Sequence, residues 1–321
     1  MSKWSHPRRG SLQVWPRKRA QRPYARIRNW VKKEDLKLLG FIGYKVGMTH
    51  AIVKDNTQFS ITKGQNISIP ITIIECPPLK PYSLRFYKQD FDGLKIISEV
   101  FAKNIDKEVQ KRTDISKKPT NEIPKQFDNV RLVIYTRPKS TDVGRKKPEM
   151  IELGVGGKNL NEKLEFLKGI LDKEIKINDV FKSNQVVDIH GITKGKGFQG
   201  TIKRFGVKRL RHKSKKKVRG IGTMGPWNPH KVRYSVPNTG KMGFHQRTEY
   251  NKLLIKVGDN PKDINVKSGF HKYGDIKNNY ILIKGSVTGT NKRAVVLTEA
   301  MRPRKRTEQF EILSLNLNHE S

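Results

Sequence analysis

Sixty consecutive residues, 189–248, contain sixteen lysines and arginines but no aspartate or glutamate. The first 33 residues have the same character, with eleven basic residues and no acid before Glu34. The two segments hold 27 of the chain's 67 basic residues and none of its 29 acidic ones. Because uncompensated cations repel one another, both segments need a strongly negative partner. The folded core therefore has to come from the other 228 residues, where 40 bases face 29 acids.

The overall composition indicates a folded core and a negatively charged binding partner. The 321 residues can form one large or two ordinary domains, and a hydrophobic content of 35% supports a real core. A net charge of +38 points to a polyanion, with nucleic acid ahead of an anionic membrane. The best apolar run, 67–76, is short and interrupted by polar residues, so we expect no membrane association.

The N-terminal sequence and the cysteine content lead us to expect an intracellular protein. The N-terminus lacks the apolar core of a signal peptide, and Pro7, Pro16 and Pro23 interrupt the helix that a transit peptide needs. Cys76 is the only cysteine, which excludes intramolecular disulfides and multi-cysteine zinc sites. A reducing compartment fits both observations.

Outside the basic segments, strand patterns dominate. Segment 84–101 is typical of a hairpin that turns at Asp92–Gly93. Leucines at helical spacing predict one amphipathic helix over 159–171, capped by Asn159 or Asn161. Runs of β-branched and aromatic residues predict further strands within 38–53, 68–75, 130–136, 150–155, 185–193, 252–258, 280–289 and 293–297.

We therefore expect a mainly β fold with an inserted α/β domain. The early and late strands would form one barrel-like domain, and the two strands and helix between them would form the insertion. The expected divisions are an extended basic N-terminal arm (1–36), a β-barrel (37–101, 184–193 and 249–300), an α/β insertion domain (102–183), a long basic loop (194–248) and a C-terminal tail (301–321).

The strongest motif is the basic run inside the loop. Ten of the seventeen residues from Lys203 to Arg219 are lysine or arginine. A solvated helix face would need acids three or four residues away, and none exist. A localisation signal would not explain the other 43 acid-free residues of the stretch. Binding to a phosphate backbone explains both features.

Gly195, Gly197 and Gly200 match a dinucleotide-binding pattern. That pattern requires an amphipathic helix directly after the glycines and an acidic residue about twenty positions further on, and the sequence has neither.

Trp227 lies between Pro226 and Pro229, outside any regular element. Tryptophan usually packs in a core, but this proline- and glycine-rich setting favours stacking on a nucleic-acid base. His230 and His245 have no acidic neighbour for a catalytic triad and no partner at metal spacing, so we expect contacts with phosphate or 2′-hydroxyl groups. We find no catalytic motif, and we expect no enzyme activity, metal or cofactor.

Several segments, in order, resemble the L-three family of ribosomal large-subunit proteins in its archaeal and eukaryotic form. They are PRRGSL…PRKR (7–19), FIGYKVGMTH (41–50), DIHGITKGKGFQGTIKRFGV (188–207), GPWNPHKVRYSV…GKMGFHQRTEYNK (225–252) and LIKGSVTGTNKR (282–293). TMGPWNPH and HQRTEYNK are closest to archaeal members. Arg233–Tyr234 departs from the apolar-aromatic pair frequent in relatives, and the lysine-rich stretch before Trp227 departs from the eukaryotic pattern.

The resemblance implies a closed six-stranded barrel of the translation-factor type with an inserted α/β domain. It implies a cytoplasmic, non-enzymatic protein that binds large-subunit ribosomal RNA early in assembly, beside neighbouring large-subunit proteins. It implies neither a homo-oligomer nor a small-molecule substrate. In the family the N-terminal arm and central loop thread inward, and the loop tip, where Trp227 lies by match to GPWNP, approaches the peptidyl-transferase centre.

The side chains that we expect to contact RNA are basic, histidine or tryptophan residues, almost all from the two acid-free segments. They are Trp4, His6, Arg8, Arg9, Arg17, Lys18, Arg19, Arg22, Arg26, Arg28, Lys45, Lys194, Lys196, Lys203, Arg204, Lys208, Arg209, Arg211, His212, Lys213, Lys215, Lys216, Lys217, Arg219, Trp227, His230, Lys231, Arg233, Lys241, His245 and Arg247. Both segments are expected to be disordered alone and to fold on binding.

Two other hypotheses stay open on the residues alone. A general DNA-binding protein would bind duplex DNA comparably and would not sediment with ribosomal subunits. An RNA-modifying enzyme would need a cofactor loop or a buried catalytic carboxylate, and the sequence shows neither.

Overall fold

The computed structural model describes residues 17–114, 122–214, 217–303 and 308–316. These divide into two compact units, each treated separately below. The loop unit comprises residues 192–246 with the N-terminal residues up to Pro23, and the sheet unit comprises 24–191 and 247–321. Residues 1–23 and 192–246 contain 22 lysines and arginines and no acid, so the charge asymmetry of the sequence follows the division into units.

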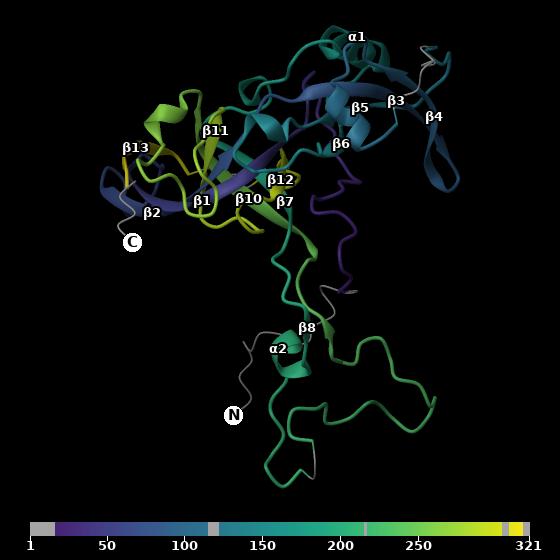
Figure 1. Cartoon of the computed structure of the whole chain (residues 1–321), viewed down its shortest axis with the longest axis vertical. Coiled ribbons are helices and arrows are strands. Elements are labelled where there is room, and N and C mark those ends of the chain that lie inside the picture. The colour runs from purple at the N-terminus through teal and green to yellow at the C-terminus, as the bar shows by residue number, and fades with distance from the viewer. Residues whose placement is uncertain (1–16, 115–121, 215–216, 304–307, 317–321) are drawn as a thin grey trace. The chain divides into compact units, whose positions relative to one another are not determined.

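The fold is mainly β, as predicted (Figure 1). The strands are β1 (Gly40–Asp55), β2 (Asn66–Glu75), β3 (Lys80–Asp90), β4 (Gly93–Phe101), β5 (Asn129–Tyr135), β6 (Met150–Leu153), β7 (Gln185–Ile192), β8 (Phe198–Gln199), β9 (Gly240–Lys241), β10 (Gln246–Gly258), β11 (Tyr280–Lys284), β12 (Ala294–Glu299) and β13 (Phe310–Leu315). The α-helices are α1 (Leu160–Ile170) and α2 (Thr201–Phe205), and short 3₁₀ turns occur at Lys107–Lys111, Pro138–Ser140, Ile177–Asp179 and Pro261–Asp263.

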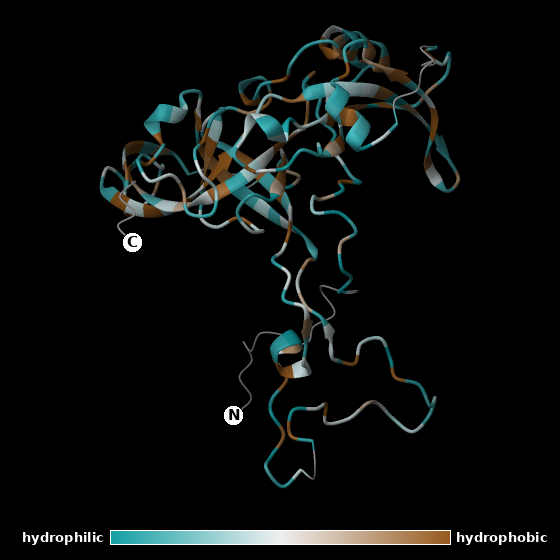
Figure 2. Ribbon diagram, viewed as in Figure 1, coloured by the Kyte–Doolittle hydropathy of each residue, from teal (hydrophilic) through white to brown (hydrophobic). Residues whose placement is uncertain are grey.

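Six strands of the sheet unit close into a ring in the order β12–β7–β10–β11–β2–β1, because β1 also pairs with β12. The ring closes because β1 is long enough to pair with β12 through Gly40–Tyr44 and with β2 along most of its remaining length. At Gly43 the strands approach so closely that a Cβ would lie 2.8 Å from the carbonyl oxygen of Glu75. Apolar side chains such as Phe41, Ile71 and Ile281 are fully buried, and hydrophobic residues are prominent on these strands in Figure 2.

A second, four-stranded antiparallel sheet has the order β4–β3–β5–β6. The predicted hairpin is confirmed, since β3 and β4 pair from Ser83–Phe101 to Asp90–Gly93. Its placement in the barrel domain is wrong, because β3 pairs on its other side with β5 and not with a strand of the ring. The predicted helix is also confirmed as α1, which buries Leu167 and packs Leu164 against the core.

Two terminal regions differ from the sequence prediction. The expected C-terminal tail contains β13, which pairs with residues 51–55 of β1. The second half of the expected extended arm is part of the sheet unit: Tyr24 and Ala25 are buried, and Trp30 packs against the core. The ring of Trp30 occupies space that glycine leaves, since a Cβ on Gly154 would lie 2.5 Å from the indole Cγ. Apolar burial therefore orders residues 24–30 although their charge pattern resembles that of an extended arm.

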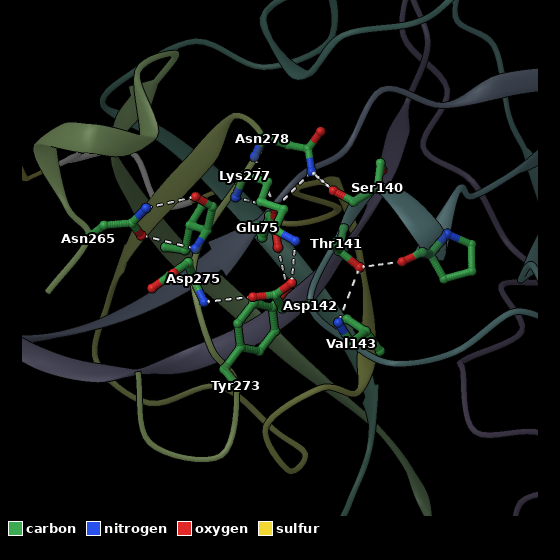
Figure 3. A network of polar contacts seen from close by, with 12 residues as sticks. Glu75, Ser140, Thr141, Asp142, Val143, Asn265, Tyr273, Asp275, Lys277 and Asn278 are labelled. Atoms are coloured by element: carbon green, nitrogen blue, oxygen red, sulfur yellow. Dashed lines mark hydrogen bonds and ion pairs between the residues drawn. The ribbon is translucent and has the colours of Figure 1, made fainter. Parts of the chain in front are cut away.

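A buried carboxylate ties loops of the sheet unit together (Figure 3). Glu75 is fully buried, and its Oε1 accepts hydrogen bonds from the backbone N–H groups of Lys277 and Asn278 at 2.9 and 3.0 Å. Its Oε2 accepts the hydroxyl of Tyr273, whose pKa is raised by burial and by the nearby Glu75 charge. Nearby, Asp142 accepts the Asp275 N–H at 3.0 Å. These partners make Glu75 a structural anchor rather than a reactive group.

Candidate nucleic-acid interface

The base of the loop unit is an antiparallel ladder. Thr193 N–H donates to the carbonyl oxygen of His245 at 2.9 Å, and Lys196 N–H donates to that of Met242 at 2.9 Å. The ladder continues into the β8–β9 pair, where Phe198 lies opposite Lys241. The α2 helix follows at once and ends at Gly206, whose φ of 68° is the left-handed conformation that glycine adopts easily. The base of the basic loop therefore has regular structure that the sequence did not predict.

A short piece of the N-terminal segment adds to this ladder. Ala20 N–H donates to the carbonyl oxygen of Phe244 at 2.7 Å. Gly243 N–H donates to Nε2 of His245 at 3.1 Å, so Nε2 is an acceptor and the other ring nitrogen carries the proton. That Nδ1–H donates to the carbonyl oxygen of Lys18 at 2.7 Å. We call residues 17–20 with 193–197 and 242–245 the clasp.

Two arginines of the loop unit use carbonyl oxygens and an aromatic ring in place of acids. Arg17 donates to the carbonyl oxygen of Arg204, and its guanidinium lies 4.0 Å from the centroid of the Phe205 ring. The Arg204 guanidinium donates to the carbonyl oxygens of Lys241 and Asn238 at 3.0 and 2.9 Å. Backbone carbonyl oxygens and the face of the Phe205 ring thus hold these two guanidiniums, because the loop unit has no carboxylate side chain to pair with them.

Most of the other predicted cations face solvent. Among the described residues of the loop unit, fifteen lysines and arginines are exposed, together with His212. The fifteen are Lys18, Arg19, Arg22, Lys194, Lys196, Lys203, Lys208, Arg209, Arg211, Lys213, Lys217, Arg219, Lys231, Arg233 and Lys241. Trp4, His6, Arg8, Arg9, Lys215 and Lys216 lie outside the described residues.

The predicted site residues of the sheet unit have mixed positions. Arg26 and Arg28 are exposed, whereas Arg247 is half-buried, and burial lowers the pKa of its guanidinium. Lys45 is buried, and its ammonium donates to the carbonyl oxygens of Val287 and Gly289 at 2.5 and 3.2 Å. Burial also lowers the pKa of Lys45, against the opposing effect of the Glu249 charge.

Two predicted contacts are corrected by these positions. The ammonium of Lys45 is taken up inside the sheet unit, so this residue supports the fold rather than presenting a charge to RNA. His245 is only 7% exposed, and both ring nitrogens bond within the clasp, so its ring is not offered to a phosphate. The sequence prediction of RNA contacts at Lys45 and His245 used only charge and residue type. Both side chains are buried, so neither can reach RNA.

Trp227 is not a core residue: 84% of its surface is exposed. The His230 ring packs edge-on against it, with centroids 4.8 Å apart and planes at 65°. The Asn228–Pro229 peptide bond between them is cis. Met224 and Tyr234 are exposed nearby in the sequence, so this part of the loop presents ring and thioether surface next to cations.

Sequence reasoning missed the groups that organise the clasp. Phe205 and Phe244 provide the ring faces for Arg17 and Arg19, at 4.0 and 5.4 Å. Gly243 has a φ of 75°, and a Cβ there would lie 2.1 Å from the carbonyl oxygen of Lys194. The available signal was a phenylalanine next to a glycine, with arginine or histidine on its other side, in a segment with no apolar run.

The described residues of the loop unit therefore present donors and cations, and the sequence of this unit contains no carboxylate side chain that could act as a general base. Within the described ranges, no three histidine, cysteine, aspartate or glutamate side chains are grouped to hold a metal ion. Across the same ranges, no helix combines the length and apolarity needed to cross a membrane. The exposed lysines and arginines can bind an anion electrostatically, and the exposed ring of Trp227 can stack on another ring.

Comparison with known proteins agrees with the sequence resemblance. The chain is 44% identical to large ribosomal subunit protein uL3 of Methanococcus aeolicus, over 94% of this chain and 92% of the relative. It is 44% identical to uL3 of Methanocaldococcus jannaschii and 43% identical to uL3 of Archaeoglobus fulgidus, with 94% of this chain covered in both cases. The family described as Ribosomal protein L3 matches residues 1–119 and 112–321. The chain belongs to the Ribosomal protein L3 family.

Proposed function

We propose that this chain is a structural constituent of the cytoplasmic large ribosomal subunit and that it binds large-subunit ribosomal RNA through the loop unit. The observation that carries the proposal is the set of fifteen exposed lysines and arginines in the described loop unit, in segments without any acid. Phosphates at the spacing of a folded RNA neutralise such a surface, and released counterions drive the binding. Family membership supports the ribosome as the site.

The clasp gives the loop a fixed base from which the basic residues reach RNA. The guanidiniums of Arg17 and Arg204 are partly used within the unit, so they organise the base. The exposed cations among residues 208–213 and 217–219 lie beyond α2 in the chain and supply the charge for phosphate contacts. Exposed Trp227 stacks on an unpaired base, a contact that folded RNA offers more readily than duplex DNA.

The family resemblance supports three finer parts of the proposal. The ring of six strands is a barrel of the translation-factor type that docks on the RNA surface, with the β4–β3–β5–β6 sheet and helix α1 as an inserted domain. The N-terminal segment and the loop thread towards the peptidyl-transferase centre, and binding occurs early in assembly. The protein acts as a single copy without enzymatic activity, by positioning RNA beside neighbouring large-subunit proteins.

Sedimentation of a tagged chain through a sucrose gradient at high salt tests this function. We expect the chain to move with large subunits, and Lys208→Gln/Lys213→Gln/Lys217→Gln to be displaced at lower salt. The matched control, Lys107→Gln/Lys168→Gln/Lys173→Gln, removes the same charge from exposed positions of the sheet unit and should behave as the parent does. Absence from subunits, with equally tight binding to duplex DNA, would favour a general DNA-binding protein instead.

A further inference from the structure

The β3–β4 hairpin carries an apolar surface that the RNA interface does not explain. Phe91 at its turn is fully exposed, and Ile96 is 55% exposed. Leu94 and Ile96 are two residues apart on β4 and therefore share one face of the strand. Hydrophobic residues lie along this hairpin in Figure 2. A group of exposed apolar side chains of this kind marks a contact with a partner.

The hairpin holds Phe91 in a defined place. Pairing runs from Ser83–Phe101 to Asp90–Gly93, and the turn uses Gly93 at a φ of 115°. The carboxylate of Asp90 accepts the N–H of Phe91 at 2.8 Å and also pairs with Lys95. A ring presented on a preorganised turn loses little conformational entropy when it enters a pocket.

The charges on the hairpin argue against RNA as the partner. Segment 84–101 contains three basic and three acidic residues. Arg85 lies 3.1 Å from Glu99 and 2.6 Å from Glu152, so its cation is neutralised within the sheet. Of the two aspartates beside Phe91, Asp90 is paired with Lys95 and Asp92 is exposed, so the tip offers phosphate no net positive charge. A second copy is also disfavoured, because two chains of charge +38 repel each other.

We propose that the tip of this hairpin docks into an apolar pocket with a basic rim on another protein of the same large subunit. Phe91 enters the pocket, Leu94 and Ile96 cover its edge, and the exposed carboxylate of Asp92 faces the basic rim. A central aromatic anchor inside a polar rim is the usual anatomy of a protein–protein contact. This inference rests on the proposed function, because it requires the chain to be assembled in the subunit.

Photo-crosslinking in assembled subunits tests the docking. Benzoylphenylalanine replaces Phe91 in the full chain, and Ile61, which is also fully exposed in the β1–β2 loop, is the control position. We expect position 91 to crosslink to one ribosomal protein, giving a band that protease removes and nuclease does not. A crosslink to RNA, a crosslink to a second copy, or no product above the level at position 61 would overturn the proposal.

A second measurement follows the partner without a crosslink. Phe91→Ser/Ile96→Ser should lower the amount of the crosslinked protein in purified subunits severalfold by quantitative mass spectrometry, while Phe91→Leu keeps it. Unchanged amounts in the double variant would also overturn the docking. Absence of this chain itself from the subunits would instead overturn the proposed function together with the docking, so the two failures are distinguishable.

Discussion

The imidazole of His245 joins the loop to the N-terminal segment, donating its Nδ1–H to the carbonyl oxygen of Lys18 at 2.7 Å. The two residues are 227 positions apart in the chain. The same ring accepts the N–H of Gly243, so one neutral histidine fixes two backbone strands. The base of the basic loop is thus held by internal bonds, and the phosphates proposed as its partners are needed for its charge rather than for its whole shape.

Removing this ring should loosen the clasp. His245→Ala leaves the Lys18 carbonyl and the Gly243 N–H unpaired, at a cost of about 1–3 kcal/mol for each group that stays buried. We expect faster hydrogen exchange at the amides of Ala20 and Gly243 in the free protein. Exposed His212→Ala is the control and should leave both rates unchanged. Equal protection in the parent and His245→Ala would show that the clasp does not depend on the ring.

A glycine pair tests the same ladder from the backbone. Gly243→Ala forces a left-handed conformation on alanine, at about 1–2 kcal/mol, and its Cβ would meet the carbonyl oxygen of Lys194 at 2.1 Å. Gly195→Ala is the matched change, since its nearest neighbour would lie 3.8 Å away. We expect limited proteolysis to cut the loop base of the Gly243 variant faster. The same digestion pattern for both variants would contradict the geometry.

Trp227→Ala should separate stability from binding. The side chain is 84% exposed, so the free energy of unfolding should change by less than about 0.5 kcal/mol. Loss of base stacking should weaken RNA binding by about 1–3 kcal/mol, and Trp227→Phe should restore most of it. Thermal unfolding and RNA titration measure the two effects. A large loss of folding stability in Trp227→Ala, with unchanged affinity for RNA, would show that Trp227 packs in the fold and does not bind RNA.

Asp106 gives the second sheet a defined response to acid. Burial opposes its ionisation, but hydrogen bonds from Arg137 and Lys80, both at 2.9 Å, outweigh burial and lower its pKa to about 2. This folded-state pKa lies below the value of about 3.9 for an unfolded aspartate. The carboxylate therefore stabilises the fold above about pH 4, and that contribution is lost as the pH falls to about 2.

Denaturant unfolding at several pH values checks this. Asp106→Asn should be less stable than the parent at pH 6, and the difference should vanish near pH 2. Exposed Asp92→Asn serves as the control with little effect at either pH. A difference that grows as the pH falls would contradict the assigned direction of the shift.

Local patterns in the sequence predicted local structure well. The Asp92–Gly93 turn and the leucine spacing of α1 each depend on residues near one another, and both elements occur as expected. Membership of the hairpin in the second sheet could not be predicted, because it depends on β3 choosing β5 as its other neighbour. Strand β13 was missed for the same reason, since its pairing with β1 spans most of the chain.

Charge patterns predicted which segments carry the candidate interface but not the role of each residue. Lys45 and His245 are cationic or titratable groups in suggestive places, yet both are buried and bonded internally. Tyr24 and Trp30 lie in a basic segment and still pack against the core, because apolar burial outweighs local charge. Such roles depend on contacts between residues distant in sequence, which composition does not encode.

The salt dependence of RNA binding tests the central claim, that the acid-free loop unit holds RNA phosphates, most directly. For the full chain and a large-subunit ribosomal RNA transcript, log affinity against log salt should have a slope of about −10 if a dozen or so phosphates are neutralised. Lys208→Gln/Lys213→Gln/Lys217→Gln should reduce its magnitude by about 2–3, whereas Lys107→Gln/Lys168→Gln/Lys173→Gln should leave it unchanged. A slope near zero, or equal losses in the two triple variants, would contradict the account.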